Sequence, residues 1–225
     1  MTRRKDIELA ASLGAHAVGF IQVPSSSRFV PENELVHLSR LAQSLGLETI
    51  GVFQNQNVDE IKNSALKYGF SGVQLHGDEK EDVCEELKKT GLKVIKTLAV
   101  EPSSVSTSSS LPASPTTSEP STPGPLSLTN FWNNYHMCDA ILADTKMGNT
   151  SGGTGKAFDW EKFKATLPEV VSPKLIVAGG VGPENVEKLL ATLSPCGLDI
   201  NSAVEDSPGV KNHALMKKLV NILSK

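Results

Sequence analysis

The sequence predicts an α/β fold in which parallel strands alternate with helices and curl into a barrel. Short apolar runs alternate with amphipathic stretches along most of the 225 residues. Two runs near the end of the chain stop at small residues, Gly179-Gly180 and Ser202-Ala203, and each precedes a stretch suited to a helix start. Loops after the last two strands of eight-stranded βα barrels recurrently bind phosphate. This pattern indicates an enzyme acting on a phosphorylated small molecule, although glycines that only make tight strand-to-helix turns account for it about as well.

Seven predicted strands are short, largely apolar or β-branched and without polar alternation, which is typical of strands buried on both faces of a parallel sheet. They cover residues 17–23, 49–53, 72–75, 94–98, 140–143, 175–178 and 198–200. The stretches between them predict helices over residues 6–13, 31–45, 58–68, 79–89, 159–166, 183–192 and 210–223. The first visible element is a helix, which is unusual because the first helix of a βα repeat should follow a strand.

One segment interrupts the alternation. Residues 101–127 include 10 Ser, 6 Pro and 4 Thr among 27 residues, so apolar burial cannot offset the entropy lost on ordering them. We expect a disordered surface insertion here, and a tolerated loop expansion is a better explanation than a phosphorylated or partner-binding tail. The remaining length suits one core, so the sequence predicts a single domain over residues 1–225.

Composition excludes several classes of function. A formal net charge of −3 with scattered Lys and Arg argues against nucleic acid as a partner. No run approaches the roughly 20 apolar residues that span a bilayer, and the first residues lack the apolar stretch of a secretory signal. The three cysteines lie in no disulfide-framework or zinc-site spacing. We therefore expect a cytoplasmic enzyme with a small-molecule substrate and no metal.

Polar residues at the carboxyl ends of predicted strands are the candidate site, because active sites of βα barrels lie at that end. Arg28 could bind a carboxylate in bidentate fashion or be a solvated loop charge. Gln74 and His76 flank Leu75, so strand alternation directs both toward one side, where they meet substrate or make a structural hydrogen bond. Asp144 ends an apolar run before a glycine-rich loop, where a raised pKa would suit a general acid and the alternative is a turn or cap residue.

Several segments together resemble the phosphoribosylanthranilate isomerases, the cofactor-free (β/α)8 TIM barrels of tryptophan biosynthesis. No single segment is specific, but together they span nearly the whole chain outside residues 101–127 and occur in the family's order. The shared segments are Gly14-Ala-His-Ala-Val-Gly-Phe, Ser27-Arg-Phe-Val, Gly72-Val-Gln-Leu-His-Gly-Asp-Glu, Asp144-Thr-Lys, Ser151-Gly-Gly-Thr-Gly-Lys-Ala-Phe-Asp-Trp, Ala178-Gly-Gly-Val-Gly-Pro-Glu-Asn-Val and Leu198-Asp-Ile-Asn-Ser-Ala-Val-Glu-Asp-Ser-Pro-Gly-Val-Lys.

The resemblance implies an Amadori rearrangement that needs no redox or electron-sink cofactor. It makes Asp144 the general acid, Arg28 the clamp on the anthranilate carboxylate and Asp199 a ligand of sugar hydroxyls, with Gln74 and His76 lining the site. The backbone expected to hold phosphate is that of Gly179, Gly180, Ser202 and Ala203, and the glycines of the expected lid are Gly152, Gly153 and Gly155. Ala203 stands where the family more often has glycine, a change that leaves the backbone donor intact.

The start of the sequence departs from the family pattern, which opens with Lys-Ile-Cys-Gly-x-Thr-Arg and uses that cysteine as general base. Here Met1 falls on the x, so the first strand and its cysteine are absent from the printed sequence. We expect that the printed start is an internal methionine of a longer chain, and that without this strand and this base the printed chain is poorly stable and inactive. Two other hypotheses remain open. One is a catalytically silent barrel that binds phosphoribosyl or anthranilate groups, and the other is an indole-glycerol-phosphate synthase, for which Lys96 is the one candidate strand lysine.

Overall fold

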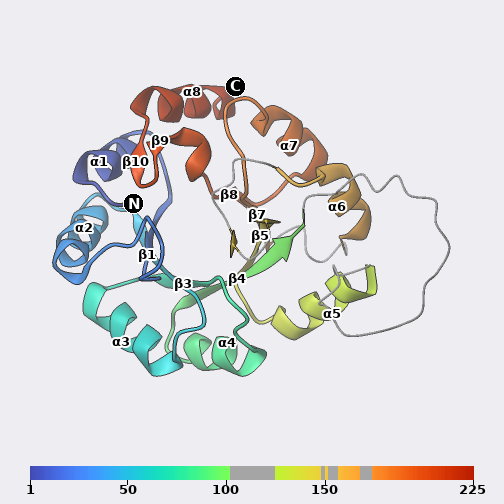
Figure 1. Ribbon diagram of the computed structural model, residues 1–225, viewed down its shortest axis with the longest axis horizontal. Helices are drawn as coiled ribbons and strands as arrows, with labels where there is room; N and C mark the ends of the chain where they lie inside the picture. Colours follow the sequence, from blue (N-terminus) through green and yellow to red (C-terminus); the bar gives the residue numbers. More distant parts are fainter. Residues whose placement is uncertain (102–124, 148–149, 152–156, 168–173) are drawn as a thin grey trace.

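The computed structural model describes residues 1–101, 125–147, 150–151, 157–167 and 174–225. Its main sheet is parallel, with strand order β1-β2-β3-β4-β5-β7-β8, and the two-residue strand β6 pairs antiparallel with β5. Helices surround these central strands (Figure 1). The predicted α/β barrel is confirmed. The strands of this sheet are β1 (Ala17–Ile21), β2 (Glu48–Phe53), β3 (Gly72–Leu75), β4 (Lys93–Val100), β5 (Ala140–Met147), β6 (Thr150–Ser151), β7 (Leu175–Val177) and β8 (Gly197–Leu198).

The described helices lie on the outside of the sheet and connect successive strands (Figure 1). They are α1 (Arg4–Ser12), α2 (Glu32–Ser44), α3 (Val58–Tyr68), α4 (Glu81–Lys88), α5 (Pro125–Tyr135), α6 (Trp160–Thr166), α7 (Val186–Leu193) and α8 (His213–Leu223). Side-chain caps fix several starts, because the first backbone N–H groups of a helix need acceptors. Asn57 accepts from the N–H of Asp59 before α3, and Asp159 accepts from the N–H of Lys162 before α6.

Two sequence predictions are wrong at the element level. The predicted insertion 101–127 runs three residues too far, because α5 begins at Pro125; residues 102–124 lie outside the described part. The predicted helix 210–223 begins at His213, where Asn212 caps it by accepting from the N–H of Leu215. The residues before it form a hairpin, β9 (Glu205–Ser207) and β10 (Val210–Lys211), that follows the 3-10 turn η2 (Ser202–Val204).

Strand β5 is longer than its apolar run. The run from 140 to 143 predicts a strand that ends before Asp144, but the pairing with β4 continues through Ala99 opposite Asp144 and Val100 opposite Thr145. Asp144 therefore lies within a strand and is held by the ladder on that side. A side chain fixed in this way has a better defined position than one in a loop.

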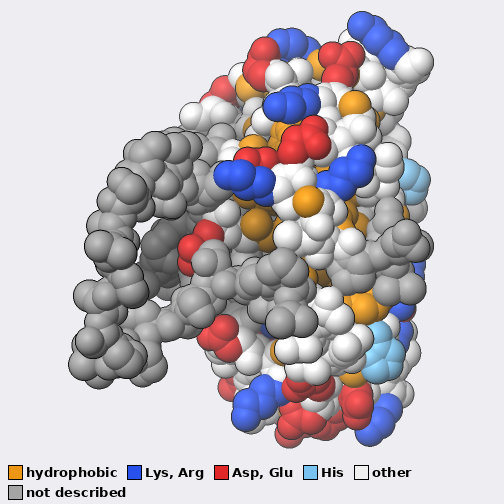
Figure 2. Space-filling model, turned by 90° about the vertical axis from the view of Figure 1, so that its right-hand side faces the viewer, with side chains coloured by type: hydrophobic (Ala, Val, Ile, Leu, Met, Phe, Trp, Pro, Cys, Tyr) orange, Lys and Arg blue, Asp and Glu red, His pale blue; other side chains and the backbone are white. Residues whose placement is uncertain are grey.

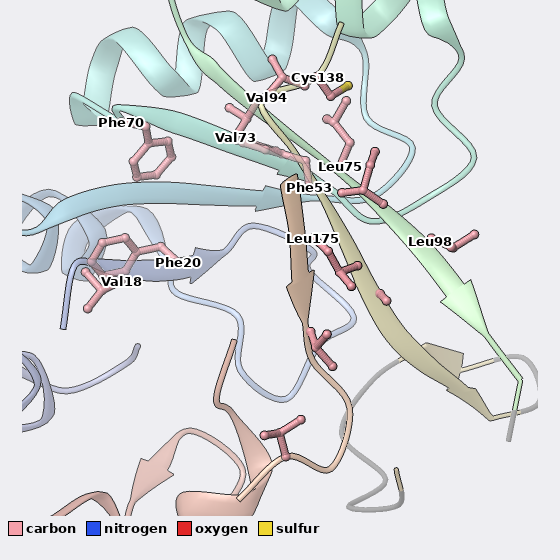
Figure 3. Packing of buried hydrophobic residues seen from close by; sticks show 14 of the residues in the cluster. Val18, Phe20, Phe53, Phe70, Val73, Leu75, Val94, Leu98, Cys138 and Leu175 are labelled. Carbon is pink, nitrogen blue, oxygen red and sulfur yellow. The ribbon is translucent and has the colours of Figure 1, made fainter. Parts of the chain in front are cut away.

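The apolar core fills the space between the sheet and its helices. Side chains from successive strands and from the loop before β3 meet there, as Figure 3 shows for Val18, Phe20, Phe53 and Phe70. Phe20 and Phe70 stack with ring centroids 6.2 Å apart. These contacts bury the outward-facing side chains of the strands and leave the inward-facing ones, together with the strand ends, for the site.

Residues 1–3 contact both the first strand of the sheet, β1, and the hairpin that follows its last strand, β8. The backbone nitrogen of Met1 donates to the carbonyl of Gly19 in β1, and the hydroxyl of Thr2 donates to the carbonyl of Gly209 in the hairpin turn. Arg3 Nη2 donates to the carbonyl of Lys211 at 2.9 Å. Among the described residues, β1 and β8 each pair with a strand on one side only.

Acidic and basic side chains are interspersed over the face of the molecule shown in Figure 2, in agreement with the balanced composition. Within the described ranges, no helix combines the length and the apolar character that crossing a membrane demands. Likewise, the described side chains include no group of three or more His, Cys, Asp or Glu residues placed to hold a metal ion.

Candidate active site

The candidate site lies where the carboxyl ends of the parallel strands meet. His76 directly follows β3, Thr97 lies in β4, Asp144 lies in β5, and Asp199 directly follows β8. In a parallel barrel these ends share one rim, so side chains far apart in the sequence converge there. The structure brings together Gln74, His76, Asp144 and Asp199, as the sequence predicts, and adds Thr97.

Asp144 is the most perturbed of these groups. It is 6% exposed, and its Oδ1 atom is buried with no hydrogen-bond partner among the described residues. Its Oδ2 atom lies 3.4 Å from Nε2 of His76. Burial raises the pKa of Asp144 to about 6, with a further contribution from the negative charge of Asp199. A carboxyl with such a pKa holds its proton part of the time near neutral pH, which is what a general acid requires.

His76 lies between Asp144 and the interior side chains of β3 and β4. Its Nδ1 atom is 3.1 Å from Nε2 of Gln74 and 3.2 Å from Oγ1 of Thr97. The contact with Gln74 shows that both side chains lie on one side of β3, as strand alternation predicts. Burial lowers the pKa of His76, so the ring is neutral near pH 7.

Asp199 is partly buried next to the same groups. Its backbone N–H donates to the carbonyl of Val177 at 3.0 Å, which continues the β7–β8 pairing by one residue. Burial raises the pKa of its carboxyl, while the nearby positive charge of Lys211 opposes this. Its charge also acts on Asp144 and His76, so the three groups form one electrostatic cluster.

Arg28 is held by an ion pair that sequence analysis did not find. Its Nε atom lies 3.0 Å from Oε2 of Glu205, and its Nη2 atom lies 2.6 Å from the same oxygen. The two side chains are 16% and 4% exposed, so Arg28 is not a solvated loop charge. Lys211 Nζ lies 3.1 Å from Oε1 of Glu205. Glu205 occupies one edge of the guanidinium, and the Nη1 atom has no partner among the described residues. The other edge can therefore donate hydrogen bonds to a carboxylate.

The two predicted phosphate-binding loops are in contact. A Cβ atom built on Gly182 would lie 2.7 Å from Cβ of Ala203, so the loop after β7 touches η2. Gly179 has φ +74°, and a Cβ there would lie 2.3 Å from Oγ1 of Thr145, so this position requires glycine.

The side chain of Asn185 makes two hydrogen bonds to the backbone of the loop after β7. Its side chain accepts from the N–H of Gly182 and donates to the carbonyl of Gly180, both at 2.9 Å. Within the described part of the chain, the N–H groups of Gly180, Ser202 and Ala203 donate to no acceptor. Free backbone donors from two adjoining loops form a typical anion site. The predicted lid glycines Gly152, Gly153 and Gly155 lie outside the described residues.

Lys96 does not point toward this site. Its Nζ atom lies 2.7 Å from Oε2 of Glu79 and donates to the carbonyl of Gly77 at 2.6 Å. The ammonium also lies 5.6 Å from the ring centroid of Tyr135 in α5. Neighbouring strand residues project to opposite faces, so Thr97 faces the barrel interior while Lys96 faces the helices. The lysine that would carry synthase chemistry is therefore committed to a buried ion pair.

None of the three cysteines reaches the strand ends that carry the site. Cys84 lies in α4 and Cys138 precedes β5, and both are buried in the core. Cys196 is exposed and immediately precedes β8, at the end of that strand opposite Asp199. None of them is therefore placed to act as a base at the rim.

The fold and this geometry define a class: a parallel α/β barrel enzyme with a buried carboxyl and two adjoining loops whose backbone N–H groups are free among the described residues, all on one rim. Comparison with known proteins narrows the class. A model of the family described as N-(5'phosphoribosyl)anthranilate (PRA) isomerase matches residues 1–120 and 121–222. The chain therefore belongs to this isomerase family.

Individual relatives agree. The N-(5'-phosphoribosyl)anthranilate isomerase of Trichodesmium erythraeum is 30% identical over 247 residues, which cover 100% of this chain and 94% of the relative. The isomerase of Nostoc punctiforme is 33% identical over 93% of this chain and 88% of its own length. The crystal structure of the isomerase from Thermus thermophilus superimposes with a TM-score of 0.77 at 30% identity, covering 100% of this chain and 95% of that one.

Proposed function

We propose that this chain converts N-(5-phosphoribosyl)anthranilate to 1-(2-carboxyphenylamino)-1-deoxyribulose 5-phosphate, a step of tryptophan biosynthesis. The observation that carries the proposal is Asp144, a buried carboxyl with a pKa of about 6 and an oxygen that has no partner among the described residues. It lies on the same barrel rim as the two loops proposed to bind phosphate. Membership of the isomerase family supports the same reaction.

The first step opens the furanose ring. The anilino nitrogen forms a double bond to C1, the bond between C1 and the ring oxygen breaks, and that oxygen takes a proton from Asp144. A positioned general acid typically contributes 10²–10⁴-fold to such a step. The raised pKa of Asp144 supplies the proton, because the carboxyl is still partly protonated near neutral pH.

Three groups of residues hold the substrate. Arg28 binds the anthranilate carboxylate through the guanidinium edge that Glu205 leaves open. Asp199 binds sugar hydroxyls, and Gln74 and His76 line the site. The phosphate is held by backbone N–H groups of Gly179, Gly180, Ser202 and Ala203, for which the contact between the two loops is the supporting observation.

The second step removes the proton from C2 on the opposite side of the sugar and needs a base there. Cys84, Cys138 and Cys196 all lie away from the rim. The family resemblance implies a cysteine as this base, and no described cysteine lies at the rim. The outer edges of β8 and β1 have no partner strand among the described residues. The reaction itself uses no redox cofactor, and the three free cysteines suit a reducing cytoplasm.

A catalytically silent barrel that binds phosphoribosyl or anthranilate groups is the second candidate. The observation that favours it is the absence of a cysteine base at the described part of the rim. An indole-glycerol-phosphate synthase has less support, because Lys96 is paired with Glu79 on the far side of β4 and the family match is to the isomerases.

The deciding experiment follows the loss of phosphoribosylanthranilate fluorescence on addition of the chain. We expect turnover that depends on Asp144, so the chain and its variant Asp144→Asn are compared under identical conditions, each as printed and with a strand reading Lys-Ile-Cys-Gly ahead of Met1. Tight binding of substrate without turnover would select the silent barrel, and equal turnover by both proteins would remove Asp144 from the mechanism.

A further inference from the structure

His76 has a defined hydrogen-bonding environment on its Nδ1 side. The amide nitrogen of Gln74 lies 3.1 Å from Nδ1, and the hydroxyl of Thr97 lies 3.2 Å from the same atom. An amide nitrogen can only donate, so Nδ1 must accept. A neutral imidazole carries one proton, and the remaining position for it is Nε2. The neutral state is supported by burial, which lowers the pKa of His76.

The Nε2 side of the ring faces Asp144. Nε2 lies 3.4 Å from Oδ2 of Asp144, while Oδ1 is buried and has no partner among the described residues. With its proton on Nε2, His76 can only donate toward the carboxyl group. Hydrogen bonds of catalytic groups are often long in ligand-free sites and shorten when substrate binds. The ring therefore presents an N–H group to the side of the carboxyl that carries Oδ2.

We propose that Thr97, together with Gln74, fixes His76 in its Nε2–H tautomer and so directs an N–H group at the carboxyl of Asp144. This inference rests on the proposed function, because it specifies what orients the general acid. When the sugar ring opens, the bond between the carboxyl of Asp144 and its proton breaks, the ring oxygen gains the proton, and the resulting carboxylate can accept a hydrogen bond from Nε2. His76 gains and loses no proton.

Thr97 is a positioning residue, since it acts through His76 and is not assigned a contact with substrate. It is 7% exposed and lies in β4 between the ladders to β3 and β5, so its side chain position is fixed by the sheet. Its hydroxyl can donate or accept, whereas a methyl group in its place can do neither. The variant Thr97→Val has nearly the same shape and removes only this donor, and Thr97→Ser keeps the donor while losing the methyl group.

The test measures the tautomer directly by nitrogen NMR of the chain labelled with ¹⁵N-histidine. The signal of His76 is identified by its loss in His76→Gln, because the chain has five histidines. We expect the wild-type ring to carry its proton on Nε2. A hydrogen bond is worth enough that losing one donor in Thr97→Val should raise the Nδ1–H population about 2- to 10-fold, and Thr97→Ser should restore the wild-type spectrum.

Kinetics give the second readout. Thr97→Val should lower kcat by a similar factor of about 2 to 10 with little change in KM, because the contact acts on the acid and not on substrate binding. A wild-type ring protonated on Nδ1 would overturn the proposal, and so would a Thr97→Val protein with the wild-type tautomer and kcat. The NMR readout on the wild-type chain stands even where Thr97→Val fails to fold. It also needs no turnover, so loss of the proposed function would show separately, as equal rates for wild type and Asp144→Asn.

Discussion

Replacing Asp144 with asparagine should make the fold more stable while it removes most of the activity. The carboxyl is buried with no cation beside it among the described side chains, and burial together with the charge of Asp199 raises its pKa from 3.8 to about 6. The folded chain thus binds this proton more tightly than the unfolded chain does. Stability is lost as pH rises from about 4 to about 6, and above pH 6 the ionised carboxylate destabilises the fold in full.

The size of this effect follows from the pKa elevation. At 1.36 kcal/mol per pH unit, a pKa raised from 3.8 to about 6 corresponds to about 3 kcal/mol. The side chain is 9% exposed, so solvent screens little of this. The amide of asparagine brings its own buried N–H groups, which cost about 1 kcal/mol where they lack an acceptor. The expected net gain is about 2 kcal/mol, or roughly 4–8 °C in Tm for a chain of this length.

The assay is thermal unfolding of the wild-type chain and of Asp144→Asn between pH 4.5 and 8, together with turnover at pH 7.5. The Tm difference should be largest above pH 6 and shrink toward pH 4.5, while kcat falls at least ~100-fold. Asp139 supplies the matched control at the start of the same strand. Burial raises its pKa, but Lys88 and the N–H of Val94 outweigh this and lower it, so Asp139→Asn should destabilise the fold near neutral pH. A Tm of Asp144→Asn that equals the wild-type value at every pH would refute the reasoning.

Three further changes test other parts of the structure. Arg28→Ala should raise KM about 10-fold or more with a smaller effect on kcat, because a carboxylate clamp binds ground state and transition state alike; an unchanged KM would exclude it from the site. Replacing residues 102–124 by a short linker should leave turnover within a few fold and stability within about 1 kcal/mol, since each doubling of loop length costs only about 0.6 kcal/mol; a chain that no longer folds would show that this segment packs on the barrel. Adding a strand that reads Lys-Ile-Cys-Gly ahead of Met1 should raise Tm and turnover together, because it can pair with the edges of β1 and β8 that have no partner strand among the described residues. Equal turnover by the printed and extended chains would show that the base lies elsewhere.

The sequence predicts the strands well because each is a short apolar run. It selects Asp144, His76 and the glycine loops as candidates because they stand where such runs end. It misses α5, whose first residues continue the Ser- and Pro-rich composition of the segment before it. It also misses the hairpin of β9 and β10, whose first strand Glu205–Ser207 is polar and partly exposed. The Pro-Gly pair at 208–209 is a turn signal that could have indicated this hairpin.

Contacts between residues far apart in the sequence are harder to predict than strands and helices. Arg28 and Glu205 are separated by 177 positions, and no local pattern in the sequence connects them. The same holds for Thr97, an ordinary β-branched residue in β4, whose proposed role comes from its contact with the imidazole of His76, directly after the neighbouring strand β3. Sequence analysis identifies residue types that can do chemistry, whereas the residues that orient them become visible when the fold brings them into contact.

The environments of Asp144 and Glu205 explain why only one of these two carboxyls is suited to donate a proton. Burial would raise the pKa of Glu205, but Arg28 and Lys211 outweigh it, so this carboxyl stays ionised. Asp144 is equally shielded from solvent, but its described neighbours are a neutral imidazole and the carboxylate of Asp199, and its pKa rises instead. Divergent pKa values for two carboxyls are a common basis for distinct roles in one enzyme. Among the described side chains, Arg28 and Lys211 lie beside Glu205, where a substrate carboxylate would bind, and no cation lies beside Asp144. A cation beside Asp144 would lower its pKa and release its proton before the sugar ring opens.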